Sequence, residues 1–254
     1  MNESRVTWTK YSSPQALYPL AGKLIPWCAG AACCFMAAGL YLGFFVAPTD
    51  FQQGDAYRII FVHVPAAWMS MFLYVVMALW AGLGLGLKAR PSFMMAQAIA
   101  PTGAMFTFLA LLTGALWGKP TWGAWWVWDA RLTSELILLF LYVGVMLLHE
   151  SIDDLRRADR ASALAALVGV VNVPIIYFSV RWWNTLHQGA SVSMTAAPKM
   201  AATMLTAMVL MAVGFWLYSM AVILIRLRCV MLERNRQAGL SQRVFEQDVK
   251  ELRA

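Results

Sequence analysis

The stretch Trp122-Gly123-Ala124-Trp125-Trp126-Val127-Trp128-Asp129 contains four of the chain's 12 tryptophans. Such an aromatic, weakly charged run is costly to leave in water, so it is expected at a membrane interface or against a large flat aromatic ligand. Just upstream, Gly118-Lys119-Pro120 is expected to end any helix arriving from the preceding residues. If the run is itself helical, one face carries Trp122, Trp125, Trp126 and Asp129. We therefore predict a short separate element lying flat at a membrane surface.

The composition of the whole chain is that of a membrane protein. Of its 254 residues, 61% are hydrophobic and only 13% are charged, whereas soluble domains carry about 25% charged residues. A removable signal peptide is not expected, because residues 1–23 are polar and mixed. The four cysteines form no Cys-x-x-Cys pair, which argues against a thiol-disulfide or zinc function. A phosphate-binding Gly-x-x-x-x-Gly-Lys sequence is also missing, so the chain is not itself an ATPase of that type.

Six apolar runs are long enough to cross a bilayer, which takes about 20 residues each. They lie at 24–46, 60–87, 93–117, 132–149, 161–180 and 200–225. The predicted fold is therefore all-α: one polytopic membrane domain over residues 1–225, followed by a charged, helical tail over residues 226–254. The tryptophan stretch falls between the third and fourth spans.

The distribution of lysine and arginine predicts the orientation of these spans. Fifteen of the 20 basic residues fall in the N-terminus, the segments 88–92 and 150–160, and the tail, and five fall in the other connections. Because cytoplasmic loops are rich in lysine and arginine, both termini are expected inside. The loops 47–59, 118–131 and 181–199 are then outside, and the net charge of +7 needs no nucleic-acid partner.

Two of the three histidines are predicted at the level of the tryptophan stretch. His63 lies near the outer end of the second span, and His187 lies just beyond the outer end of the fifth. Ionisable residues at the edge of a membrane core are functional candidates. His149 ends the fourth span on the other side, where a partly charged imidazole suits a helix C-terminus.

Two histidines beside an aromatic platform suggest haem as the ligand. Neutral imidazoles bind haem iron well, and the macrocycle could pack against Trp122, Trp125, Trp126 and Trp128. Arg58 and Arg131 are expected at the same mouth, where planar guanidinium groups could pair with the propionates. A purely structural role remains an alternative for three residues. Asp129 could simply cap a helix, and the Arg131 side chain could simply extend to the membrane interface. Glu135 could simply complement a helix dipole. Trp182 and Trp183 could be aromatic-belt residues.

The motif residues resemble a known family, the haem-handling proteins of cytochrome c maturation that carry a tryptophan-rich "WWD" signature. The resemblance runs from Trp122 through Gly123 to Asp129 and on to Glu135, and it covers essentially residues 20–225. It includes the segment from His63 to Trp68 and the segment from Trp182 through His187 to Gly189. Six spans and a short chain match the smaller members of that family, whereas larger members have more spans and further histidine pairs.

The resemblance implies a haem carrier and assembly factor rather than an enzyme. It implies that His63 and His187 are the axial ligands of haem b at the periplasmic face of a bacterial inner membrane, with the motif (118–135) as platform. Delivery would be to a periplasmic haem chaperone (CcmE), together with an ABC-type ATPase (CcmA), its permease (CcmB) and a small single-span protein (CcmD). Two alternatives remain: a cytochrome b-type electron-transfer subunit, and a small-solute permease with a polar path near Asn172 and Pro174.

Overall fold

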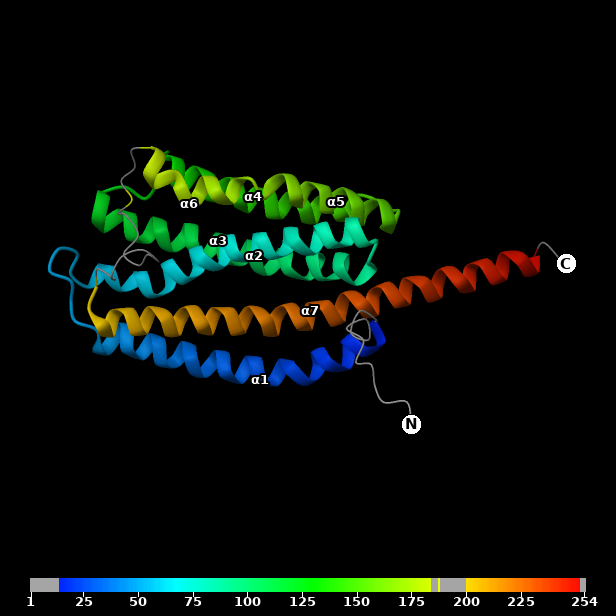
Figure 1. Ribbon diagram of the computed structural model, residues 1–254, viewed down its shortest axis with the longest axis horizontal. Helices are drawn as coiled ribbons and strands as arrows, with labels where there is room; N and C mark the ends of the chain where they lie inside the picture. Colours follow the sequence, from blue (N-terminus) through cyan, green and yellow to red (C-terminus); the bar gives the residue numbers. More distant parts are fainter. Residues whose placement is uncertain (1–13, 184–186, 188–199, 252–254) are drawn as a thin grey trace.

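The computed structural model describes residues 14–183, 187 and 200–251 and is built of helices (Figure 1). The predicted motif residues 184–186, 188 and 189, like residues 1–13, lie outside the described part. The elements are α1 (Pro14–Tyr41), the π-helix η2 (Leu42–Val46), the 3-10 helix η3 (Asp55–Ile59), α2 (Ile60–Leu87), α3 (Arg90–Trp122), α4 (Ala130–Glu150), α5 (Leu155–Gly169), α6 (Asn172–Trp182) and α7 (Ala202–Glu251).

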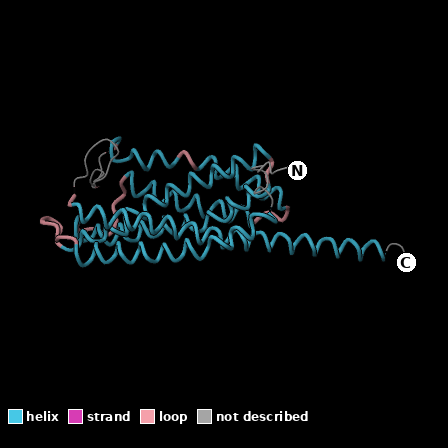
Figure 2. Tube along the Cα trace, turned by 60° about the horizontal axis from the view of Figure 1, so that its bottom comes forward, coloured by secondary structure: helices cyan, strands magenta, loops and turns pink. Residues whose placement is uncertain are grey.

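The prediction of six membrane-spanning helices is confirmed by length and composition. Six helical runs are long and apolar enough to cross a membrane, at Ala16–Val46, Asp55–Leu87, Arg90–Trp122, Ala130–Glu150, Leu155–Trp182 and Ala202–Arg236. Each contains all or nearly all of one predicted span. α1 packs mainly on α7, and α2 lies along α3 (Figures 1 and 2). The tail is helical as predicted, because α7 continues without a break from the last span to Glu251.

The fifth span is divided into two helices at Val170 and Val171. Pro174 lies in the first turn of α6 and has no N–H to donate to the carbonyl of Val170, so the α-helical ladder loses a hydrogen bond at this break. Asn172, buried at the same break, donates from Nδ2 to the backbone oxygen of Ser134 on α4 (2.8 Å). The polar side chain therefore satisfies a carbonyl of the neighbouring helix, as buried polar groups between membrane helices do.

The connections of the bundle gather at two ends (Figure 1). We call the end with the segments 47–54, 123–129 and Trp183 the site end. We call the other end, with the turns at 88–89 and 151–154 and the protruding part of α7, the tail end. The described parts of the three loops predicted to share one face of the membrane therefore lie at one end of the bundle, which brings His63 and the tryptophan stretch to the same level.

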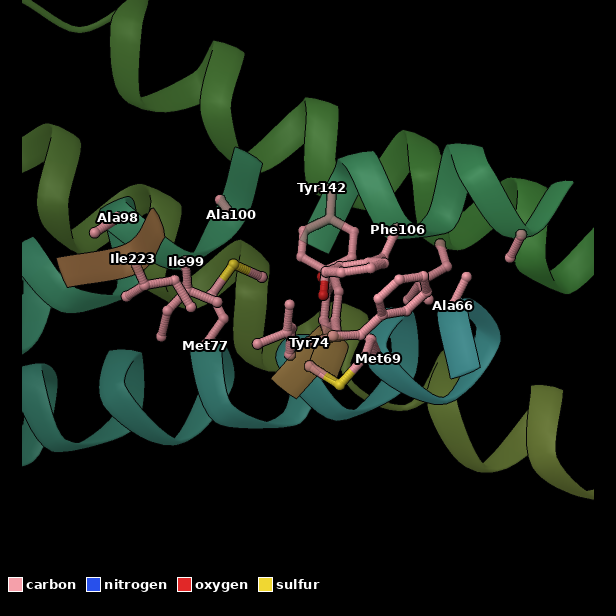
Figure 3. Close-up of a cluster of buried hydrophobic side chains, with 14 of the residues drawn as sticks. Ala66, Met69, Tyr74, Met77, Ala98, Ile99, Ala100, Phe106, Tyr142 and Ile223 are labelled. Carbon is pink, nitrogen blue, oxygen red and sulfur yellow. The ribbon is translucent and has the colours of Figure 1, made fainter. Parts of the chain in front are cut away.

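A cluster of buried hydrophobic side chains, which includes Tyr74, Phe106 and Tyr142, fills the middle of the bundle (Figure 3). The rings of Tyr74 on α2 and Tyr142 on α4 meet edge to face at 4.7 Å between centroids, and both side chains are fully buried. A Cβ on Gly103 would overlap the Tyr142 ring, and one on Gly169 would overlap the Tyr74 hydroxyl. Small residues thus let these helices approach closely, which is the main source of packing energy between helices in lipid.

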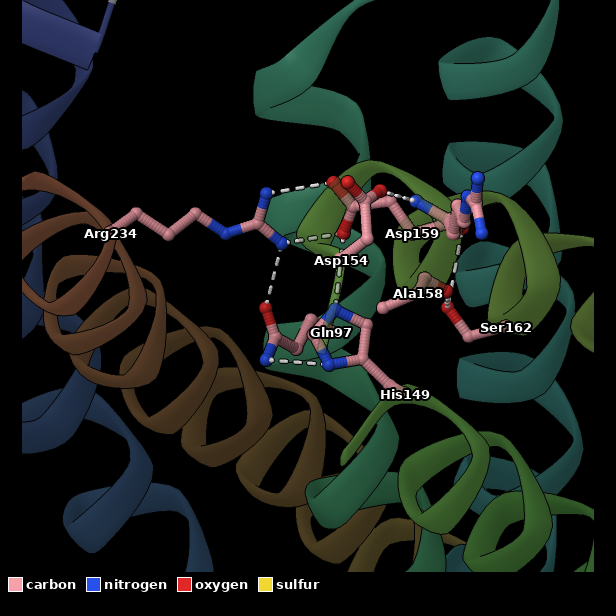
Figure 4. Close-up of polar contacts among 8 residues, drawn as sticks. Gln97, His149, Asp154, Ala158, Asp159, Ser162 and Arg234 are labelled. Atoms are coloured by element: carbon pink, nitrogen blue, oxygen red, sulfur yellow. Dashed lines mark hydrogen bonds and ion pairs between the residues drawn. The ribbon is translucent and has the colours of Figure 1, made fainter. Parts of the chain in front are cut away.

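A polar cluster joins α3, α4, α5 and α7 at the tail end (Figure 4). Asp159 accepts two hydrogen bonds from the guanidinium of Arg234, at 2.7 and 2.8 Å. It also accepts one from Nε2–H of His149 (3.1 Å), while Gln97 lies 3.5 Å from Nδ1 of that ring and accepts from Arg234 at 3.0 Å. His149 is in the last turn of α4, as predicted. It also belongs to a closed network that fixes α7 against α5.

Candidate functional site

A cavity opens at the site end between α2, α3 and α4. It contains about 1240 Å³ of empty space, including its open mouth, and α6 and α7 contribute Ile176 and Met208 to its wall. Its polar or aromatic lining consists of Gln53, His63, Trp68, Trp117, Thr121, Trp122, Arg131, Glu135 and His187. The structure therefore brings both predicted ligand histidines to one cavity, although they are far apart in the sequence.

The His63 ring is held through its Nδ1 nitrogen. Its Nδ1 lies 3.0 Å from the backbone oxygen of Ala110 and 3.0 Å from the Thr113 hydroxyl. A carbonyl oxygen can only accept, so Nδ1 carries the hydrogen, and the lone pair of the neutral ring is on Nε2. A Cβ on Gly114 would come within 3.1 Å of the ring and press on it, so the glycine leaves room for the imidazole to lie this close to α3.

His187 is held in the same way by the last residue of the tryptophan stretch. Its Nδ1 lies 3.1 Å from Oδ2 of Asp129, and its ring meets Trp122 edge to face at 4.8 Å. Burial lowers the pKa of His187 below its usual value, and the hydrogen bond to Asp129 opposes part of this effect. The ring is therefore neutral near pH 7. A carboxylate behind a neutral imidazole is the arrangement that orients metal-binding histidines in proteins.

Asp129 also caps the start of α4. Its Oδ1 accepts the backbone N–H of Leu132 at 2.8 Å, so the predicted helix cap is confirmed. One carboxylate thus fixes both the first turn of α4 and the orientation of His187. This link explains why an aspartate follows the tryptophans directly.

The tryptophan stretch differs from the prediction in its local structure. α3 does not end at Gly118-Lys119-Pro120 but continues to Trp122, because Pro120 lies in the last turn, where only one hydrogen bond is lost. The helix ends at Gly123, whose φ of 77° closes the last turn with a bond from its N–H to Lys119 (3.1 Å). The residues from Ala124 to Asp129 are not helical, so the predicted single helical face does not exist.

The four tryptophans consequently face different surroundings. Trp122 lines the cavity, whereas Trp125 and Trp128 are exposed at the end of the bundle, with relative accessibilities of 56% and 77%. Trp126 is half-buried and packs edge to face on Trp128 at 5.3 Å. Only the first tryptophan of the motif is therefore part of the cavity wall.

The two predicted arginines also differ. Arg131 lines the cavity one helical turn before Glu135, and its guanidinium makes no hydrogen bond within the described part of the chain. Glu135 is buried and accepts from the Ser70 hydroxyl at 2.7 Å. Arg58 instead donates to the carbonyls of Gly43 (2.7 Å) and Ala47 (3.1 Å). Its guanidinium thus caps the end of the first span and lies apart from the cavity wall.

Comparison with known proteins identifies the family. The model of the family described as "Heme exporter protein C" matches residues 7–242. The chain is 47% identical over 235 residues to Heme exporter protein C of Escherichia coli strain K12, covering 92% of this chain and 94% of the relative. It is 46% identical to the protein of the same name from Bradyrhizobium diazoefficiens, covering 91% and 87%, and 41% identical to that from Paracoccus denitrificans, covering 92% and 97%. The chain belongs to the Heme exporter protein C family.

Several residues that line the cavity were not predicted from the sequence. Trp117 packs edge to face on His63 at 5.7 Å between centroids, and its Nε1 donates to Oε1 of Gln53 (2.8 Å). A signal for this wall was present, because Gly114, Trp117, Gly118 and Thr121 recur at i, i+3, i+4 and i+7 and so share one face of α3. The chain therefore carries a second stripe of cavity-lining residues on α3, immediately before the tryptophan motif.

Proposed function

We propose that this chain binds haem b in the site-end cavity, with His63 and His187 as axial ligands, and passes it to a second protein during cytochrome c maturation. The observation that carries the proposal is that both histidines line one cavity and each donates Nδ1–H to a fixed acceptor. In a neutral ring of that tautomer, Nε2 is the donor nitrogen that haem iron takes. The iron would supply the coordination chemistry, and the chain would supply the two oriented nitrogens.

The remaining lining of the cavity fits the periphery of a haem. Arg131 is a mostly buried cation at the mouth, without a hydrogen bond among the described residues, so it is suited to pair with a propionate. Trp117, Trp122 and Trp68 provide apolar walls for the flat macrocycle. Arg58 could pair with the second propionate only if its guanidinium left the carbonyls of Gly43 and Ala47.

The exposed tryptophans support a handover from this cavity. Trp125 and Trp128 present aromatic surface next to the site without lining it, and aromatic residues are frequent anchors of protein interfaces. We assign them to docking of the receiving periplasmic chaperone (CcmE). The chain would act with the ATPase CcmA, the permease CcmB and the single-span protein CcmD. The proposal includes no nucleic-acid partner and no enzymatic reaction by this chain.

The orientation follows from the same proposal. The site end would be periplasmic and the tail end cytoplasmic in a bacterial inner membrane, since the tail end holds the basic turns and the basic C-terminal helix. Reporter fusions at residues 52, 124 and 190 should report the periplasm, and those at 90, 155 and 254 the cytoplasm. A periplasmic signal from residue 254 would contradict this orientation.

The direct test of function is the absorption spectrum of the purified protein beside covalent haem on the co-expressed chaperone. Wild-type protein should show six-coordinate haem, and His63→Ala or His187→Ala should each change that spectrum. Haem that leaves with the chaperone supports the carrier. Haem that stays bound and exchanges electrons with quinol would instead support the cytochrome b-type alternative and overturn the proposal.

A further inference from the structure

The loop between the first two spans is a small, well-fixed structure at the mouth of the cavity. Oδ1 of Asp50 accepts the backbone N–H groups of Gln52 (2.9 Å) and Gln53 (2.8 Å), and Gly54, at a φ of 58°, donates back to the Asp50 carbonyl at 3.0 Å. The Tyr57 hydroxyl closes the base of the loop on the carbonyl of Pro48 (2.6 Å). The backbone from which the Gln53 side chain extends is therefore held in place.

Gln53 reaches from this loop into the cavity wall. Its Oε1 accepts the indole N–H of Trp117 at 2.8 Å, and both residues line the cavity. The Trp117 ring stands at 75° to the His63 ring, with 5.7 Å between the centroids. A continuous series of contacts thus connects an exposed loop to one of the two histidines.

The contacts of His63 show what this series can control. The hydrogen bonds from Nδ1 to Ala110 and Thr113 fix one edge of the ring, but a ring held along one edge can still tilt about that edge. Trp117 packs against the imidazole and opposes such a tilt, and the Gln53 carbonyl in turn prevents the indole from turning away. Losing the bond between Gln53 and Trp117 would therefore leave His63 in place but less precisely aimed.

We propose that Gln53 is a positioning residue for His63, acting through Trp117, so that the loop 47–54 controls how firmly one axial ligand is held. The proposal rests on the proposed function, in which His63 binds haem iron. Its consequence is that a partner that displaces the loop from outside the bundle would loosen this ligand and favour release of the haem. The competing explanation is that the hydrogen bond only attaches the loop to α3.

The chain offers a matched control for this test. Gln52 is the exposed neighbour of Gln53, and its side chain makes no hydrogen bond with a described residue. Gln53→Ala removes the acceptor, and Gln52→Ala is the control. Trp117→Phe keeps a ring but removes the indole N–H. Gln53→Glu keeps an acceptor oxygen, which Gln53→Ala lacks. Each is made in the full-length protein, together with the double variant of Gln53→Ala and Trp117→Phe.

Two measurements separate positioning from simple attachment. In the haem-free protein, the imidazole nitrogen resonances of His63 should shift or broaden in Gln53→Ala and Trp117→Phe but not in Gln52→Ala. In the haem-loaded protein, the low-spin signal should change, and haem loss to excess apomyoglobin should accelerate about three- to tenfold, as expected for one neutral hydrogen bond. Gln53→Glu should recover most of this loss, and the double variant should be no worse than either single variant.

The outcomes distinguish failure of this inference from failure of the proposed function. If His63→Ala alters the haem spectrum but Gln53→Ala behaves like Gln52→Ala, the positioning role is rejected while the axial assignment stands. A lower melting temperature with unchanged His63 resonances and haem spectrum would likewise reduce Gln53 to a loop attachment. If His63→Ala itself leaves the spectrum unchanged, the proposed function fails first. Gln53→Ala should add nothing in a His63→Ala background.

Discussion

Both ends of the bundle carry a histidine that is hydrogen-bonded to an aspartate, but the two pairs differ in their other contacts. At the site end His187 meets Asp129, and at the tail end His149 meets Asp159, each at 3.1 Å. The side chains are similarly buried, at 18% and 9% exposure in the first pair and 12% and 8% in the second. Burial and composition therefore do not distinguish the histidine that we propose as a ligand from the structural one.

The difference lies in which nitrogen is held and what surrounds the carboxylate. His187 is held through Nδ1 and its ring lines a cavity. His149 donates from Nε2 and has Gln97 at Nδ1, so both of its nitrogens are engaged within the cluster. Asp159 is also paired with Arg234 by two short bonds. The tail-end pair is a closed structural network, whereas the site-end pair lies at a cavity in which we propose that His187 binds haem iron.

The strongest test of this comparison removes the histidines themselves. The double variant His63→Ala, His187→Ala should lose essentially all bound haem and all transfer, because no axial nitrogen remains, and exogenous imidazole should restore part of the spectrum of either single variant. His149→Gln, which keeps hydrogen-bonding atoms at the tail end, should bind haem like the wild type. Haem content of the purified proteins is the measurement, and equal loss in His149→Gln would erase the distinction between the two ends.

Changing each aspartate to asparagine should separate stability from ligation. Asp159→Asn leaves the buried charge of Arg234 without its partner, which should lower the free energy of unfolding by about 3–5 kcal/mol. Asp129→Asn keeps an equally good helix cap, so the melting temperature in detergent should change little. Its amide N–H₂, however, would face Nδ1 of His187 and favour the other tautomer, which should weaken haem binding. The opposite pattern of melting and haem affinity would contradict the roles assigned here.

The effect of each arginine substitution on haem affinity should depend on where that side chain lies. Arg131→Ala should weaken haem binding about ten- to hundredfold with iron ligation preserved, since a charge-assisted hydrogen bond contributes about 1.5–3 kcal/mol. Arg131→Lys should recover only part, because the planar fork is lost. Arg58→Ala should have a smaller effect on haem affinity, as its guanidinium caps Gly43 and Ala47. Arg181, exposed at the same end, is the control, and a larger loss in Arg58→Ala than in Arg131→Ala would reverse the assignment.

The smallest effect on haem capture is expected from the exposed tryptophans. Trp125→Ala with Trp128→Ala should reduce covalent haem on the co-expressed chaperone while the protein retains most of its own haem, because neither side chain lines the cavity. Trp27→Ala on α1 changes another exposed tryptophan far from the motif and should leave transfer unchanged. If the double variant loses haem as completely as the histidine variants do, these rings are part of the binding site rather than a docking surface.

Sequence reasoning predicted much of the site but misjudged its local geometry. The two histidines, Asp129, Trp122 and Arg131 were all expected at one mouth, and the structure places them around one cavity or beside it. Trp125 and Trp128 were expected against the ligand, Trp125 on one helical face with Trp122, yet the backbone after Gly123 is not helical and both side chains are exposed. Arg58 was near in sequence to His63, but the carbonyls at the end of the first span hold its side chain elsewhere.

The amino-acid sequence by itself determined the six helices, because a segment inside a bilayer must satisfy its backbone within the helix and therefore needs about 20 consecutive apolar residues. It also determined which residue types are available at the ends of those helices. Three sets of contacts were decided by the tertiary structure alone. Trp117 packs on His63 and donates to Gln53, Asp129 accepts from His187, and Asp159 accepts from Arg234. Those contacts depend on the rotation and approach of helices distant in the chain, which hydropathy and charge, as properties of local sequence, do not encode.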